Sequence, residues 1–250
     1  MAGLRSPYQG VWNIVRFNWH FYAVALVVGI FGILCALQFG SIVRLIAIVV
    51  VLIAAIQIAV SLWISHLIYD RSDLYDLSVI GRWDSNPTGL IVNIHAGFDE
   101  TSSILRDKFP NANFAIWDFY NSEKHTEISI RRAREIYPPD PKQIQVDTIH
   151  LPCDDAGADM VCLILAAHEI RSLEEQRLFF SELHRILKPD GKIVVIEHLR
   201  DAPNFFAFSA GFLHFFPRER WQRLWGETNF KLESEEKITP FLSAFLLSKR

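Results

Sequence analysis

The hydrophobic positions divide the chain into two unlike parts. Before residue 70 they form two long runs, 21–39 and 45–64, of 19 and 20 residues without a charge. At 1.5 Å per helical residue, each run is long enough to cross a hydrocarbon core of about 30 Å. A helix in the core of a soluble domain should carry a polar stripe, and neither run has one. We therefore predict two transmembrane helices joined by a short turn at Gly40-Ser41.

The residues around the two runs are typical of a retained membrane hairpin. The first run has no small-residue cleavage site and a second run follows it at once, so a cleaved signal peptide is not expected. Arginines are more frequent outside the hairpin than near its turn, which predicts that both ends lie in the cytoplasm. Small residues such as Gly29 and Gly32 allow close helix contact, either within one chain or between chains, and contact between chains would give a homo-oligomer.

From residue 89 the pattern changes to short apolar runs that alternate with amphipathic segments. The strand candidates are LIVNI (90–94), FAIW (114–117), ADMVCLIL (158–165) and KIVVIEH (192–198), and the helix candidates lie near 100–108, 127–137 and 173–187. This alternation predicts parallel βαβ units in a doubly wound, mostly parallel sheet. A final hairpin near 230–235 and 241–248 would add an antiparallel edge. The expected fold class is α/β, preceded by an α-helical transmembrane hairpin.

Three segments follow from this pattern. We predict a membrane anchor over 1–69, an interfacial linker over 70–88 and an α/β domain over 89–250. The linker is polar and aromatic and ends in the turn signal Asn86-Pro87, so we expect it to lie along the membrane surface.

Composition and charge narrow the function classes. The net charge is −3, whereas a nucleic-acid binder normally carries a basic surface, so no nucleic-acid partner is expected. Cys35, Cys153 and Cys162 form no CxxC pair. Neither a disulfide framework nor a metal site is therefore expected, and a reducing cytosol suits these thiols.

Three segments in the second half of the chain carry a family resemblance. Val146–Pro152 (VDTIHLP) resembles the third-strand segment of the class I S-adenosylmethionine-dependent methyltransferases. Asp159–His168 is similar to their fourth strand, and Leu183–Gly191 (LHRILKPDG) resembles their helix-to-strand turn. The resemblance covers roughly residue 89 to the C-terminus and is nearest to the small-molecule branch that includes quinone C-methyltransferases. It implies S-adenosylmethionine as cofactor and methyl transfer as activity.

The same resemblance implies a set of cofactor-binding residues. The glycine loop of the family aligns with residues 93–99, where one glycine of three remains. Asp147 would bind the adenine, and Asp118, at the end of its strand, would accept the ribose hydroxyls. The full expected set is Asn93, His95, Gly97, Asp118, Phe119, Asp147, Thr148 and Ala166. Simpler interpretations stay open: a strand-end or capping residue for Asp118, a turn residue for Asp147 and a core residue for Phe119.

Candidate residues for the acceptor lie where parallel strands end, because open α/β sheets bind ligands at that edge. Methyl transfer depends mostly on positioning, and a base is needed only for an acceptor protonated at neutral pH. We expect catalytic roles for His168, His198 and His214, and acceptor-binding roles for Glu169, Arg200 and Phe212. A structural role stays open for each histidine.

The segment Phe205–Trp221 is unusually apolar for a connection between a strand and a helix. We interpret it as a lid over a lipophilic acceptor or as a membrane-facing surface. A helix packed on the sheet is the alternative.

The function expected from the sequence is methyl transfer from S-adenosylmethionine to a small lipophilic or membrane-associated acceptor. A tethered site gains effective concentration toward molecules in the same bilayer, so the expected partners are a lipophilic substrate and the bilayer. One alternative is a catalytically degenerate methyltransferase fold that acts as a membrane-bound scaffold. Another is a dehydrogenase on the same sheet, but the absence of GxGxxG argues against it.

Overall fold

A seven-stranded sheet forms the centre of the protein in a computed structural model that describes residues 5–38, 40–125 and 127–250. Its strand order is β3-β2-β1-β4-β5-β7-β6. β7 runs opposite to the other six strands and is antiparallel to both β5 and β6. The strands are β1 (Gly89–His95), β2 (Ala112–Asp118), β3 (Ile144–Gln145), β4 (Ala158–Ile164), β5 (Leu187–His198), β6 (Phe230–Thr239) and β7 (Leu242–Lys249).

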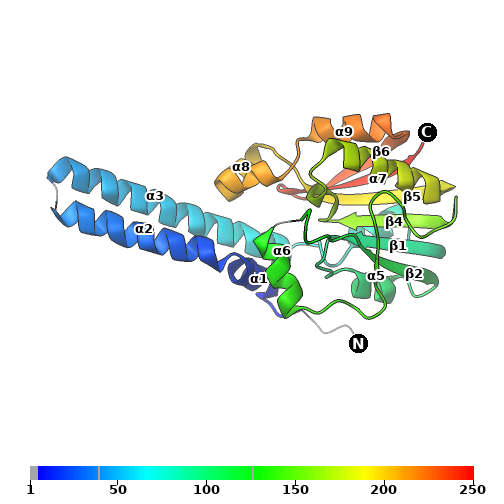
Figure 1. Ribbon diagram of the computed structural model, residues 1–250, viewed down its shortest axis with the longest axis horizontal. Helices are drawn as coiled ribbons and strands as arrows, with labels where there is room; N and C mark the ends of the chain where they lie inside the picture. Colours follow the sequence, from blue (N-terminus) through cyan, green and yellow to red (C-terminus); the bar gives the residue numbers. More distant parts are fainter. Residues whose placement is uncertain (1–4, 39, 126) are drawn as a thin grey trace.

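Helices cover both faces of this sheet, as Figure 1 shows. Side chains that alternate along β1 enter different cores, because successive residues of a strand point to opposite faces. Val92 joins an apolar cluster with α7 and α9, and Ile91 joins a second cluster with α4 and α5. The helical elements of this domain are α4 (Ser78–Trp83), α5 (Ser102–Lys108), α6 (Ile128–Ile136), α7 (Leu173–Ile186), α8 (Ala202–Phe208) and α9 (Arg218–Glu227), with 3-10 turns η2 (Ala167–Glu169) and η3 (Ser209–His214).

The observed sheet confirms the predicted mostly parallel α/β architecture, with two local differences. The third strand covers only 144–145, and residues 146–152, which the resemblance assigned to it, lie beyond the strand. Asp147 starts a turn there, because its side chain accepts the Ile149 amide at 3.0 Å. The second difference is that β5 begins at Leu187, so the Leu-Lys-Pro-Asp-Gly segment belongs to the strand, beside an irregularity in its register with β4.

Two long apolar helices project from the sheet domain as a hairpin (Figure 1). They are α2 (Trp19–Gln38) and α3 (Ser41–His66). By length and composition both could cross a membrane, and only 6% and 0% of their most apolar stretches are buried. Core helices of soluble proteins are mostly buried, so these two do not serve as core helices of the part of the chain that the structure describes.

A short N-terminal helix, α1 (Gln9–Phe17), lies beside the base of the hairpin and was not predicted. The buried carboxylate of Asp70 accepts the amides of Gly10 at 2.6 Å and Val11 at 3.1 Å, which satisfies donors at the start of α1. A Cβ at Gly10 would lie 2.4 Å from the Tyr69 Cβ, so only glycine allows this approach. The middle of α1 is tied to the α/β domain by Tyr137, which follows α6 and donates to Asn13 at 2.8 Å.

Part of the segment 70–88 packs against the sheet. Leu74, Leu77 and Ile80 are completely buried in the same apolar cluster as Ile91 of β1. Leu74 and Leu77 lie in a turn segment before α4, so no helical period marks them in the sequence. The core of the α/β domain therefore includes residues that precede β1.

Candidate functional site

The carboxyl ends of the parallel strands bring most of the predicted site residues to one edge of the sheet. His95 at the end of β1 is in register with Asp118 at the end of β2. The turn η2, with His168 and Glu169, follows β4, and His198 ends β5. Open α/β sheets bind ligands in the crevice at this edge, where the strand order reverses.

Polar side chains, rather than glycines, shape the loop after β1. Asn93 is buried, and its amide donates to Ser102 at 2.7 Å and Thr101 at 3.1 Å, which ties β1 to the start of α5. Asp99 accepts the amides of the same two residues. Gly97 has φ +91°, and a Cβ there would meet the Tyr120 ring at 2.9 Å. Only glycine fits this position without strain.

His95 and Asp118 differ in how well their polar atoms are satisfied. Both are buried, and neither ring nitrogen of His95 has a hydrogen-bond partner among the described residues, although Nδ1 lies 3.8 Å from Asp118 Oδ1. By contrast, the Asp118 carboxylate accepts from Arg134, from Gln143 at 3.1 Å and from the Tyr120 amide at 2.9 Å. The acceptor capacity of Asp118 is therefore largely used within the protein.

The residues expected to bind the adenine make contacts within the protein. Asp147 is exposed and holds its turn. Thr148 donates to Glu175 at 2.6 Å, and Phe119 lies in the core with its ring centroid 5.7 Å from that of Phe179. Ala166 is also a core residue. The cofactor-binding roles of these four residues stay predictions.

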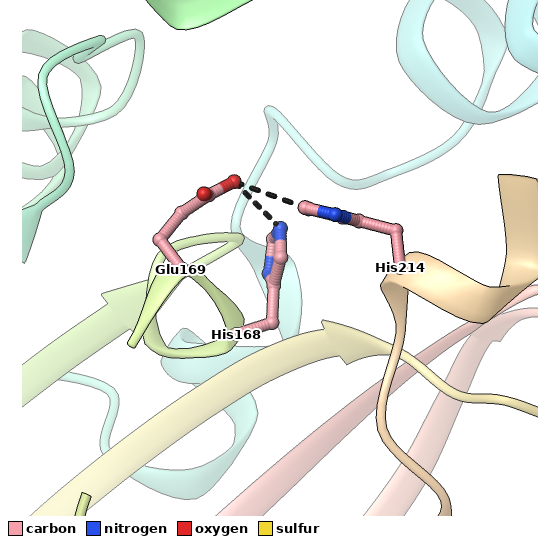
Figure 2. A group of neighbouring side chains, drawn as sticks. All are labelled: His168, Glu169 and His214. Carbon is pink, nitrogen blue, oxygen red and sulfur yellow. Dashed lines mark hydrogen bonds and ion pairs between the residues drawn. The ribbon is translucent and has the colours of Figure 1, made fainter. Parts of the chain in front are cut away.

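Three other predicted residues meet in one cluster, shown in Figure 2. Glu169 Oε1 lies 3.1 Å from His168 Nε2 and 3.3 Å from His214 Nε2. His168 and Glu169 come from η2, whereas His214 ends η3, 45 residues after Glu169. The rings of the two histidines cross edge to face with centroids 5.0 Å apart.

A second carboxylate lies beneath this cluster. Glu197 of β5 is completely buried and lies 2.6 Å from His168 Nδ1, and it also accepts the His168 amide at 3.2 Å. Burial disfavours a charged imidazole, but the carboxylates of Glu197 and Glu169 outweigh it and raise the pKa of His168 to about 10. Burial likewise opposes the Glu169 charge, yet hydrogen bonds from His168 and His214 lower the pKa of Glu169.

Two arginines hold the backbone that carries His214. Arg171 Nη1 donates to the carbonyls of His168 at 3.1 Å and His214 at 2.6 Å, so it joins η2 to η3. Arg200 donates to the carbonyls on either side of His214. Arg200 thus helps to position the backbone around His214. Its predicted role in binding the methyl acceptor stays a prediction. Phe212 in η3 stacks edge to face on Phe205, with centroids 5.1 Å apart.

His198 lies at the same edge, but both of its ring nitrogens are engaged. Nδ1 is 2.9 Å from the Phe241 carbonyl, and Nε2 is 2.9 Å from the Tyr69 hydroxyl. Because a carbonyl can only accept, Nδ1 carries the proton and Nε2 accepts from Tyr69. Burial lowers the pKa of His198 to about 4, so the ring is neutral near pH 7. These contacts match the structural role left open for this histidine.

A cleft opens beside the His168–Glu169–His214 cluster. One cavity of about 130 Å³ lies where β1 and β4 end, and Glu169 and His95 both line it. A second cavity of about 200 Å³ extends from there to α1. The two cavities share the lining residues Tyr75, Phe98, Glu100, Ile130 and Leu165. Neither Asp118 nor Asp147 lines either cavity.

Several residues of this site were not found from the sequence. Glu197 left a signal, since it is the one acidic residue in the run KIVVIEH. Arg134 and Tyr75 left none, because both reach the site from helical or irregular segments through tertiary contacts.

Comparison with known proteins supports the assignment of the fold. Residues 121–195 match the family model described as "Methyltransferase domain". Among curated proteins, none matches this chain.

Two solved structures illustrate the likeness. A SAM dependent methyltransferase from Aquifex aeolicus is 11% identical, and the alignment covers 70% of this chain and 90% of that one with a TM-score of 0.54. The mitomycin 7-O-methyltransferase is 15% identical, with coverage of 99% and 74% and a TM-score of 0.59. At such identities the likeness shows the fold, which is that of the class I methyltransferases.

The ion pair on Asp118 can be tested by its effect on stability. Replacing Arg134 with glutamine leaves a buried carboxylate without its cation, so Arg134→Gln should lower the free energy of unfolding by about 1–2 kcal/mol, discounted because Arg134 is partly exposed. Thermal unfolding in detergent measures the change. Arg131→Gln, an exposed change on the same helix, is the matched control. Equal melting temperatures for both variants would contradict the assigned ion pair.

Proposed function

We propose that this chain is a membrane-anchored methyltransferase that transfers a methyl group from S-adenosylmethionine to a small lipophilic acceptor. The match of residues 121–195 and the class I fold support the reaction type. The observation that carries the acceptor class is the cleft that runs from Glu169, at the end of β4, to α1 at the base of the apolar hairpin.

The sheet edge offers partners for S-adenosylmethionine. His95 presents two buried ring nitrogens that have no hydrogen bond within the described part of the chain, beside the cavity that Glu169 also lines. Buried polar groups without a partner are costly, so they favour a polar ligand. Gly97 would bring its backbone near the ligand, and Asp118 would hold the ribose once its Oδ2 exchanges Arg134 and Gln143 for hydroxyls. These residues fit the cofactor, with Arg134 as the group to be displaced.

The protein contributes mainly positioning to this reaction. Bound S-adenosylmethionine supplies a methyl group made electrophilic by its sulfonium. Phe98, Ile130 and Leu165 line the cleft and would exclude water from the apolar part of the acceptor. Glu169 lines the same cleft and would face the polar end of the acceptor. Fixing the acceptor in line with the methyl group accounts for most of the acceleration.

The lining of the outer cavity favours a lipophilic acceptor. Ile14 and Phe17 of α1 and Ala133 and Ile130 of α6 form its walls, together with Leu165. Apolar surface binds apolar ligands at about 25 cal/mol per Å² removed from water. Phe17 ends α1, and α2 begins two residues later, so the cavity is adjacent to the first apolar helix.

The segment after β5 supports a membrane location for the site. Gln57, inside the apolar run of α3, donates to the carbonyls of Phe206 at 3.3 Å and Ala207 at 3.2 Å, so α8 lies against the hairpin. Phe205, Phe206 and Leu213 are exposed. We assign this surface to the interface of the bilayer that α2 and α3 span, which corresponds to the membrane-facing interpretation of 205–221.

The membrane assignment predicts how the chain fractionates. Expressed in a bacterial host, the full chain should remain in the membrane pellet after an alkaline carbonate wash, because two apolar helices insert effectively irreversibly. A fluorescent protein fused to the C-terminus should fluoresce, as expected for a cytoplasmic domain. Release into the carbonate supernatant would contradict the anchor, and active alkaline phosphatase at the same C-terminus would contradict the orientation.

The cofactor assignment predicts binding of S-adenosylhomocysteine to the full chain in detergent. Gly97→Ala adds a Cβ where φ is +91°, and Asp118→Ala removes a charged acceptor. Each substitution should weaken S-adenosylhomocysteine binding by about tenfold or more, measured by calorimetry. Asp190→Ala, at an exposed position near the amino end of β5 and so at the opposite edge of the sheet, is the control and should bind like the parent chain. Absence of binding by the parent chain would refute the proposed activity and favour the scaffold.

The acceptor assignment predicts a selective loss of transfer. Ile14→Asp places a charge in the outer cavity, which Ile14 lines without lining the cavity at His95. Transfer of labelled methyl to a membrane lipid extract should fall by about tenfold or more, whereas S-adenosylhomocysteine affinity should not change. Ile128→Asp, at an exposed position of α6, is the control. Equal activity of Ile14→Asp and Ile128→Asp would show that the acceptor does not use this cavity.

A further inference from the structure

We infer that His168, Glu169 and His214 form a binding site for one divalent transition-metal ion. The three side chains offer two imidazole nitrogens and one carboxylate oxygen, all within 4.8 Å of one another. This donor set is typical of catalytic zinc and of non-haem iron sites, which keep positions open for substrate. The cysteine spacing predicted no metal site, whereas these ligands are two histidines and a glutamate.

The distances suit a shared ion. Glu169 Oε1 is 3.1 Å from one imidazole nitrogen and 3.3 Å from the other. Ligands bound at about 2.0–2.2 Å around one ion lie roughly 3.0–3.5 Å from each other. Figure 2 shows both rings directing a ring edge at the same carboxylate oxygen. Small rotations of these side chains would place an ion between the three atoms.

Neighbouring groups orient His168 as metal sites require. Glu197 lies 2.6 Å from Nδ1, so Nδ1 donates to the carboxylate. An ion that displaces the proton from Nε2 would bind the lone pair of that nitrogen. A carboxylate behind a ligating histidine is the usual arrangement in zinc sites, where it fixes the tautomer and raises basicity. Glu197 is completely buried on β5, which makes this orientation rigid.

The second histidine is positioned by backbone contacts. Arg171 binds the carbonyls of His168 and His214 with one nitrogen, and Arg200 binds the carbonyls of Leu213 and Phe215. Two segments distant in sequence are therefore fixed relative to each other at the ligand atoms. His214 remains partly exposed, with 28% of its side chain accessible, so an ion has an entry path.

The open side of the site faces the cleft. Glu169 lines the cavity of about 130 Å³ together with His95 and Leu165. An ion at the cluster would face this cavity and could bind an oxygen or sulfur atom of a ligand there, lowering the pKa of a hydroxyl or thiol. The site rests on its own geometry and does not depend on the proposed methyl transfer.

The test is metal binding to the full chain in detergent, without a polyhistidine tag and without methyl donor. After chelator dialysis, Zn²⁺ titrated in a calorimeter should bind with a stoichiometry of one, and Co²⁺ should give a visible absorption spectrum that Zn²⁺ removes. His168→Ala and His214→Ala should each weaken Zn²⁺ by about tenfold or more. His150→Ala, an exposed histidine, should bind like the parent chain.

Glu197 provides a second, independent readout. Glu197→Gln keeps the shape of the side chain but removes the charge that orients His168, so it should shift the Co²⁺ spectrum and weaken Zn²⁺ by about tenfold. Zn²⁺ should also raise the melting temperature of the parent chain but not of the His168→Ala/His214→Ala double variant.

The outcomes separate this inference from the proposed function. No stoichiometric Zn²⁺ or Co²⁺ binding, or equal binding by the double variant, overturns the metal site. Circular dichroism confirms that each variant is folded. A chain that binds S-adenosylhomocysteine but no metal refutes only the metal site, whereas one that binds metal but no S-adenosylhomocysteine refutes only the methyltransferase.

Discussion

The packing of the residues that follow α3 against the sheet is the constraint on which the rest of the structure depends. Leu74, Leu77 and Ile80 are buried in one core with β1 and β4, so the hairpin and the α/β domain form one body. Burying each such side chain contributes about 1.5–3 kcal/mol. Asp70 then binds the start of α1 and places that helix over the sheet edge. The cleft has its outer wall only because of this sequence of contacts.

The local pattern of apolar residues was enough to predict the strands of the sheet. It was not enough to predict α1 or the packing of the segment 70–88. The four apolar runs form β1, β2, β4 and β5 because a strand buried on both faces needs a continuous apolar run. Ser172 caps α7 by accepting the Glu175 amide, a local contact of the kind that a sequence pattern can indicate. In contrast, α1 and the segment 70–88 obtain their stability from tertiary contacts, which leave little periodic signal in short segments.

In the site, too, a general rule predicted some features, whereas others depend on tertiary contacts. The rule that ligands bind where parallel strands end correctly indicated the edge of the sheet where Glu169 and His95 line one cavity. The meeting of Glu169 with His214 was not predictable, because it depends on two arginines that hold η3 through backbone carbonyls. Nor does the sequence show that Arg134 covers Asp118, since a residue 16 positions away is not a local partner.

The two halves of the sheet edge differ in how their buried charges are compensated. At β2, Asp118 already has a guanidinium and an amide as partners, so a ligand must compete with the protein for it. At β4 and β5, Glu169 and Glu197 share only His168 between them, with His214 completing the partners of Glu169. Because buried carboxylates need a compensating cation, an incoming ion gains most at the second half. The apolar cleft opens at that half, so a lipophilic molecule and a metal ion would meet at Glu169.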